Sequence, residues 1–308
     1  MVKYALKRML LLIPMLIMVI FMVFFILNIT PGNPGQIILG ANARPEAIEA
    51  VNESLGVNKP LMERFFNYLW NVLHLDFGTS YRTGAPVFQD ILIKFPVTLK
   101  LAIYSIILST IIGIPVGIIS AVKEYSVLDY SLTFSSLFLA SMPSFFLAMV
   151  LILFFSLFLG ILPSTGMGTP AHYILPVVTL TLPTAAYFSR FTRTSMLETM
   201  REDYICTAKA VGASPRQIII KHALKPALLP VVTILGMYFA GLLGGAIITE
   251  VVFGLPGIGN LVLTAVKTKD APTVEAATIF LAVLYKVIMF VVDILQAAID
   301  PRLNAKLD

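Results

Sequence analysis

Six long apolar runs constrain this chain more than any other feature of its sequence. Each approaches or exceeds the ~20 residues with which an α-helix crosses the apolar core of a bilayer. Of all residues, 58% are hydrophobic and only 13% are charged. The sequence therefore predicts an all-α integral membrane protein with six transmembrane helices, folded as one domain over residues 1-308. The runs cover residues 9-29, 97-122, 133-162, 173-190, 226-249 and 277-299.

The first run could be read as a secretory signal peptide. Its apolar part is longer than the ~7–15 residues of a typical signal core. The sequence that follows it, "NITPGNPG", offers no cleavage site of small residues. We interpret residues 9-29 as a membrane anchor that is retained.

The chain has few residues that could build a metal or catalytic site. His74, His172 and His222 lack the spacing of metal ligands, and Cys206, the single cysteine, cannot form an intrachain disulfide. The sequence has no phosphate loop of the GxxxxGK[ST] kind and no readable Ser/His/Asp or Cys/His arrangement. We therefore expect a non-catalytic protein that binds no metal and no cofactor and does not itself hydrolyse ATP.

The positions of lysine and arginine predict the orientation of the chain in the membrane. With six spans, both termini share one side with the loops at 123-132 and 191-225, and this side carries most of the 22 lysines and arginines. On the other side the cations lie mainly in one long loop, interleaved with acids, and long loops contribute little to the positive-inside rule. We expect both termini to be cytoplasmic. The net charge of +5 then follows from topology and gives no support for nucleic-acid binding.

The extracytoplasmic loop at 31-96 is too long to be only a connector. It contains two segments with a proline near a helix start and a glycine at a helix stop, 45-56 and 60-78. We predict two short amphipathic helices, which either pack on the outer rim of the membrane domain or contact a partner. The apolar face of the second helix is formed by Phe65, Tyr68, Leu69, Val72 and Leu73.

Residues 203-225 form a basic segment between two apolar runs, and their pattern predicts a helix followed by a sharp turn. Residues 203-211 favour a helix, and Gly212 stands where a helix end favours a residue without a Cβ. One stripe of this helix carries Tyr204, Ala208 and Val211.

A second helix is expected directly after the turn. Ser214 can cap it, Pro215 suits its first position, and Gln217 stands three residues after Ser214, as in a capping box. The chain then re-enters the membrane near Pro226. Such a compact cytoplasmic protrusion suits docking into a groove of another protein. The alternative is a basic loop that lies on anionic lipid, which explains the charges but not the caps.

Ionisable residues and helix breakers occur inside the predicted spans. Lys286 and Asp293 are two helical turns apart in the sixth run and share one face. They either form a structural contact or line the solute pathway. The prolines are expected to cause local bends or static kinks. They are Pro115, which is flanked by Gly113 and Gly117, and Pro143, Pro176 and Pro183.

The basic segment resembles the "EAA" loop of membrane subunits in binding-protein-dependent ABC importers. Cys206, Thr207, His222 and Lys225 depart from the general form, but "DYICTAKAVG" and "HALKPALLPVVT" are similar to the spelling in the peptide and nickel branch. Further similar stretches, including "IPVGIISAVKEYSVLD", "TEVVFGLPGIGNLV" and the closing "DPRLN", extend the resemblance over nearly the whole chain. They look like the first of two permease subunits. Lys286 departs from the aliphatic residue expected there.

This resemblance implies a type I ABC importer permease fold in a prokaryotic inner membrane. The partners it implies are a second homologous permease, two ATP-binding subunits and an extracytoplasmic solute-binding protein, in addition to membrane lipid. ATP-driven closure of the ATPase dimer would move the coupling segment, 203-225, and so drive alternating access. The residues expected to couple to the ATPase are Asp203, Tyr204, Thr207, Ala208, Gly212, Ser214 and Pro215.

Several functional alternatives follow from the sequence. Peptide is the expected solute, because the spans contain no His or Cys cluster to favour bare metal; nickel or another metal carried as a chelate is the alternative. A self-sufficient secondary carrier is less favoured because the sequence shows no convincing internal repeat. An intramembrane enzyme is less favoured because the spans offer mostly Ser and Thr as polar groups.

Overall fold

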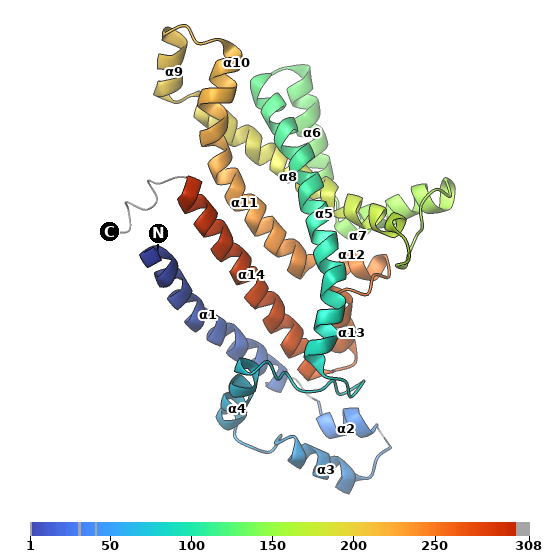
Figure 1. The fold of residues 1–308 in the computed structure, drawn as a ribbon. Coiled ribbons are helices and arrows are strands. Elements are labelled where there is room, and N and C mark those ends of the chain that lie inside the picture. The colour runs from blue at the N-terminus through green and yellow to red at the C-terminus, as the bar shows by residue number, and fades with distance from the viewer. Residues whose placement is uncertain (1, 30–31, 41, 300–308) are drawn as a thin grey trace.

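The computed structural model describes residues 2–29, 32–40 and 42–299, and the "DPRLN" motif lies outside them. The described part is helical, and five of its helical segments are long and apolar enough to cross a membrane. A sixth span results if one bent pair of helices counts as one. The long helices are α1 (Val2–Ile29), α5 (Val87–Val122), α8 (Ile174–Met200), α11 (Leu224–Gly245) and α14 (Ala271–Ile299) (Figure 1).

The predicted third span, 133-162, is bent at the expected helix breaker, Pro143. It consists of α6 (Val127–Ser141) and α7 (Ser144–Leu151), which continues as the π-helical η1 (Ile152–Phe158), and the two parts are bent by 101°. The break coincides with Pro143. Because proline disfavours the helical conformation of the residue before it, Met142 is extended, with ψ of 126°.

Proline does not interrupt the other spans. Pro115 lies inside α5, Pro183 inside α8, and Pro176 in the first turn of α8. Helix α5 begins at Val87, ten residues before the predicted run, and α8 continues to Met200, ten residues beyond it. The extra turns are polar enough to escape a search for apolar runs, but they are long parts of the same helices.

Glycines permit a close helix contact between α5 and α8. A Cβ on Gly113 would lie 2.6 Å from the carbonyl oxygen of Ala185, and one on Gly117 would lie 2.4 Å from that of Ser189. The two glycines are four residues apart and therefore face α8 together. Small residues at this spacing let two membrane helices pack backbone to backbone.

The insertion between the first two spans lies at the end of the molecule opposite to α9 and α10 (Figure 1). It contains α2 (Pro34–Leu39), α3 (Pro45–Ser54) and α4 (Leu61–Leu73). The two predicted helices are confirmed, and α2 is additional. Helix α2 is held to α3 by a hydrogen bond of 2.9 Å from the Gly35 amide to the Asn52 side chain.

Helix α4 packs on α1 through aromatic side chains. Phe65 contacts Phe21 edge to face, and Tyr68 stacks on Phe24 with ring centroids 5.6 Å apart. The prediction for Leu73 is wrong: its side chain is 69% exposed. It is the last residue of α4.

Two short helices, α12 (Ile247–Val252) and α13 (Ile258–Lys267), connect α11 to α14. The fully buried carboxylate of Glu250 organises this connection, since it accepts the Thr98 hydroxyl at 2.7 Å and the Asn260 amide at 3.0 Å. A Cβ on Gly257 would lie 2.4 Å from the same carboxylate. Burial raises the pKa of Glu250, and these hydrogen bonds act against that rise.

Candidate functional site

The coupling segment begins with α9 (Asp203–Ala210), and its turn has the predicted form. Gly212 follows the helix with φ of +87°, in the left-handed region that L-residues with a side chain rarely adopt. Its amide donates to the carbonyl of Lys209 at 3.0 Å, and the Ala213 amide donates to that of Ala208 at 3.1 Å. These two hydrogen bonds form the turn, which reverses the direction of the chain within three residues.

The second helix of the segment starts in the predicted capping box. The Ser214 side chain accepts from the Gln217 amide, and the Gln217 side chain accepts from the Ser214 amide at 3.0 Å. Pro215 is the first residue of α10 (Pro215–Gln217), which passes through the π-helical η3 (Ile218–Ala223) into α11. Residues 215–244 therefore form one continuous helical segment from the turn into the membrane span.

The buried face of α9 differs from the predicted stripe. Ile205 is fully buried and Ala208 is 9% exposed, whereas Tyr204 and Val211 are 43% and 83% exposed. Ile205 packs in a cluster with residues of α5, α8, η3 and α11, so the segment rests on the ends of three spans. The buried members of this cluster are Ala121, Met196, Ile205, Ile218, Ala223 and Ala227.

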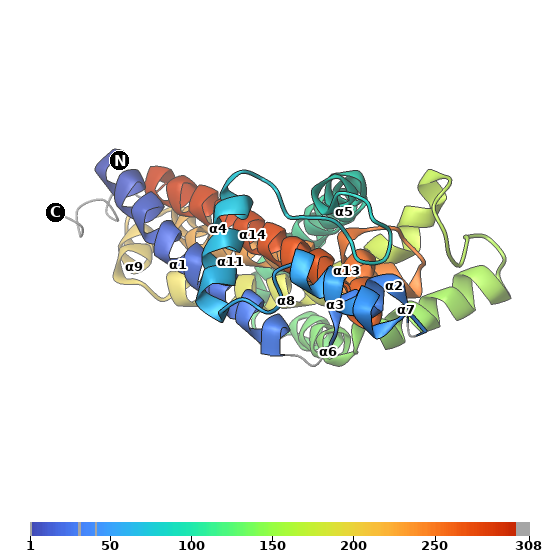
Figure 2. The ribbon, with the colours of Figure 1, turned by 90° about the horizontal axis from the view of Figure 1, so that it is seen from below.

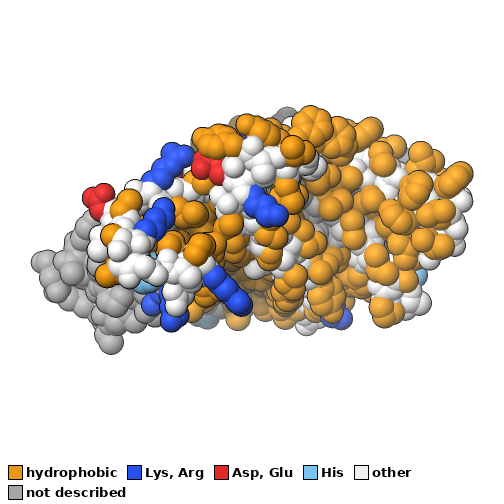
Figure 3. Space-filling view, turned by 90° about the horizontal axis from the view of Figure 1, so that it is seen from above, with side chains coloured by type: hydrophobic (Ala, Val, Ile, Leu, Met, Phe, Trp, Pro, Cys, Tyr) orange, Lys and Arg blue, Asp and Glu red, His pale blue; other side chains and the backbone are white. Residues whose placement is uncertain are grey.

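The outward surface of the segment is mixed apolar and basic. Figure 3 views this end of the molecule and shows lysine and arginine side chains around a projecting part. Asp203 and Thr207 lie on the exposed side of α9, where the Thr207 hydroxyl donates to the Asp203 carbonyl at 3.1 Å. Exposed cations of the segment are Lys209, Arg216, Lys221 and Lys225.

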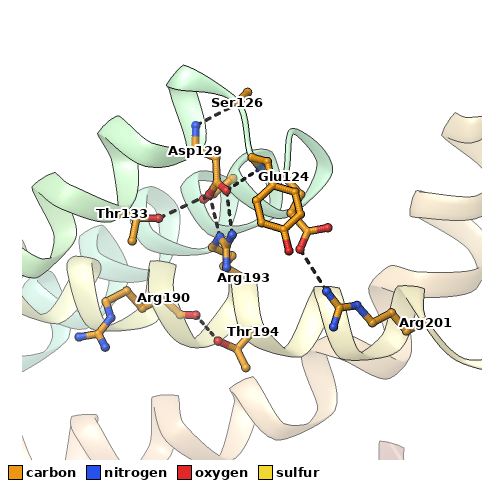
Figure 4. Close-up of polar contacts among 10 residues, drawn as sticks. Glu124, Ser126, Asp129, Thr133, Arg190, Arg193, Thr194 and Arg201 are labelled. Atoms are coloured by element: carbon orange, nitrogen blue, oxygen red, sulfur yellow. Dashed lines mark hydrogen bonds and ion pairs between the residues drawn. The ribbon is translucent and has the colours of Figure 1, made fainter.

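An ion pair that sequence reasoning missed joins helices at this end of the molecule (Figure 4). Asp129, at the start of α6, accepts two hydrogen bonds of 2.7 Å from the guanidinium of Arg193 in α8. It also accepts the Ser120 hydroxyl of α5 and the Tyr125 amide. The carboxylate is 2% exposed and thus joins three helices at one point.

Two weaker contacts extend this junction. Arg201, at the end of α8, reaches Glu124 at 3.2 Å, but its side chain is 69% exposed. The Ser195 hydroxyl donates to the Ala227 carbonyl at 2.7 Å and so joins α8 to α11. Polar bonds as well as packing therefore connect α8 to the turn before α6 and to α11, the helix that follows the coupling segment.

Two family models match almost the whole chain. Residues 113–305 match the binding-protein-dependent transport system inner membrane component, and residues 1–102 match the N-terminal part of such membrane components. The chain belongs to this family. It is a permease subunit of a binding-protein-dependent ABC importer of the dipeptide and oligopeptide type.

Curated relatives and solved structures agree with this family. The permease is 40% identical to the glutathione transport system permease protein GsiC of Pectobacterium atrosepticum and to that of Escherichia coli K12, over 99% of its own length and 100% of theirs. It resembles the inward-facing MetNI methionine ABC transporter with a TM-score of 0.59 at 22% identity, covering 70% of this chain and 98% of that one. An amino acid ABC transporter gives a TM-score of 0.51 at 16% identity, covering 70% and 94%. These structures support the fold.

The two ionisable residues predicted in the sixth span of the permease lie on α14, and both are half-buried. The ammonium group of Lys286 lies 4.0 Å from the sulfur of Met15 in α1, which directs it toward the first span.

Proposed function

We propose that this permease forms half of the pathway through which an ATP-driven importer carries short peptides into the cell. The other half would come from a second permease, with two ATP-binding subunits beneath α9 and α10 and a solute-binding protein at the α2–α4 end. The identity of 40% over the full length to glutathione permeases carries this proposal, since glutathione is a short peptide. Nickel is not proposed, because these relatives are named for a peptide.

The coupling role follows from how the segment is mounted. Ile205 and Ala208 fix α9 to the bundle, so that the turn at Gly212 projects with a defined shape. The helix of residues 215–244 starts at that turn and runs into the span. A displacement of the ATPase surface would therefore move this helix as a lever and change which side of the pathway is open.

The direct test is reconstituted transport. The permease, its permease partner and the ATPase are placed in proteoliposomes with the binding protein, and uptake of labelled tripeptide is compared with uptake of a nickel chelate. We expect ATP-dependent peptide uptake. Uptake of the chelate alone would contradict the assignment of peptide as the solute.

Replacing Gly212 by valine should uncouple ATP hydrolysis from transport. The residue has φ of +87°, and no atom outside its neighbours lies within 4 Å of the position of a Cβ, so backbone strain is the whole effect. We expect Gly212→Val to reduce uptake at least tenfold while the permease still inserts and purifies. The matched control is Gly212→Asn, because asparagine tolerates this conformation. Equal uptake by both variants would contradict the role of the turn.

The single thiol can test the orientation of the permease. Cys206 lies exposed on α9, the helix proposed to face the cytoplasm and the ATPase. A membrane-impermeant maleimide should label it in inside-out vesicles and not in cells with a permeabilised outer wall, and labelling should fall when the ATPase binds. Labelling from the outside would overturn the orientation; labelling indifferent to the ATPase would remove this helix from the coupling surface.

A further inference from the structure

A cavity of about 530 Å³, lined by both polar and apolar side chains, lies between the insertion and the bundle, far from the coupling segment. Its walls come from the end of α1, from α3 and α4, from the chain that follows α4, and from the first turns of α14. Figure 2 views the molecule from this end, with the insertion in front of part of the bundle. The cavity is large enough for a molecule the size of a short peptide.

A buried carboxylate faces this cavity. Glu275 of α14 is 8% exposed and lines the wall. Beside it lies Tyr68 of α4, whose buried hydroxyl makes no hydrogen bond of standard geometry within the described residues. Burial and the charge of Glu275 raise the pKa of Tyr68, and they raise that of Tyr81 to about 12. Two hydroxyls and a carboxylate thus converge on one region of the wall.

A positive charge faces the same cavity. Arg64 of α4 lines the wall and uses one N–H group to donate to the carbonyl of Val57, at 3.3 Å. Arg64 and Glu275 form no ion pair within 4.0 Å, although both belong to the described part of the chain. A guanidinium and a carboxyl group therefore border one space without forming an ion pair with each other.

Such an arrangement is costly unless something compensates for it. A buried carboxylate loses its hydration, and the half-buried guanidinium of Arg64 has N–H groups left over to bind an anionic group. A ligand with one positive and one negative group would satisfy both at once, since charge-assisted hydrogen bonds are the strongest polar contacts available here. The tyrosine hydroxyls and the asparagine side chains of the wall, Asn28, Asn67 and Asn71, could bond the uncharged polar groups of that ligand.

We propose that this cavity binds a zwitterion with a primary ammonium, which Glu275 accepts while Arg64 binds the anionic group. Two molecules have this chemistry: a short peptide with free ends, and the headgroup of phosphatidylethanolamine. For the peptide, the inference rests on the proposed function, and the cavity would be a holding site of the permease itself between the binding protein and the pathway.

Binding to the full-length permease in phosphatidylcholine nanodiscs tests the proposal without ATPase or binding protein. The probes for calorimetry are alanyl-alanyl-alanine and its N-acetyl form, which lacks the ammonium. We expect the acetylated peptide and the Glu275→Gln variant each to weaken binding about tenfold or more. The matched control is Glu46→Gln, because Glu46 lies exposed in the first turn of α3, outside the cavity wall.

A second arm separates the two sources of the ligand. Nanodiscs with phosphatidylethanolamine should weaken peptide binding if the lipid headgroup occupies the cavity, and wild-type permease should then retain more of that lipid on purification than Glu275→Gln. Equal binding of free and acetylated peptide, or no binding of either ligand, would overturn the proposal. If Glu275→Gln does not fold, the comparison of the two peptides on the wild type still decides.

The outcomes for this cavity and for the proposed function can be told apart. Uptake in proteoliposomes without any binding to the permease alone would reject the cavity and leave the transport role intact. Binding in the cavity without peptide uptake would support the cavity and reject the proposed transport role.

Discussion

Replacing Gly117 by leucine should abolish the folded permease, and replacing it by alanine should destabilise it by about 1–3 kcal/mol. Even the Cβ of alanine would lie 2.4 Å from the Ser189 carbonyl oxygen and 2.7 Å from the Cβ of Thr192. These atoms belong to the body of α8, so the two helices must separate. Lost packing between α5 and α8 cannot be replaced by the hydrophobic effect, because lipid is as apolar as the side chains.

Thermal unfolding of the purified permease in detergent measures this effect. The matched control is Gly241→Ala, because Gly241 lies in α11 with no atom within 4 Å of its Cβ position. We expect the control to unfold at the wild-type temperature. Similar melting temperatures for Gly117→Ala and the wild type would show that α5 and α8 can move apart without cost.

Local signals in the sequence were sufficient to predict the coupling segment. The caps at Gly212 and Ser214 involve hydrogen bonds between residues a few positions apart, so their residue types identify them. The spans were predicted for a similar reason, since the length of an apolar run is a local property. The prediction of which face of α9 is buried was less accurate, because Ile205 is buried by Met196 and Ile218, which belong to other helices.

Features that depend on distant residues could not be predicted. Thr98 and Glu250 are 152 positions apart, so neither stretch of sequence alone indicates the hydrogen bond that holds α12 and the loop after it to α5. The bend of 101° between α6 and α7 has a local signal in Pro143, but its size depends on how α7 packs against α8 and α12. The Asp129–Arg193 pair left one signal: "KEYSVLD" places an acid three residues after a helix-capping serine.

The second large effect is expected at Asp129, where Asp129→Asn should impair coupling as well as stability. The asparagine keeps the shape of the side chain but removes the charge that Arg193 binds with two hydrogen bonds of 2.7 Å. An arginine left without its partner in a largely buried site costs on the order of 3 kcal/mol. Because Asp129 also accepts Ser120 of α5, the change loosens α5, α6 and α8 together, next to the helices on which the coupling segment rests.

Coupling and stability can be separated by a matched pair of variants. Glu124→Gln breaks the neighbouring ion pair with Arg201, whose side chain is 69% exposed. We therefore expect the free energy of unfolding to fall by less than about 1 kcal/mol and uptake to stay normal. Asp129→Asn combined with Arg193→Met removes both charges and should recover much of the melting temperature, because no unpaired charge remains. Uptake should stay low in this double variant, since the bonds between the three helices are still missing. Full recovery of uptake would show that the pair serves stability alone; ATP hydrolysis that continues without uptake would show that it transmits movement.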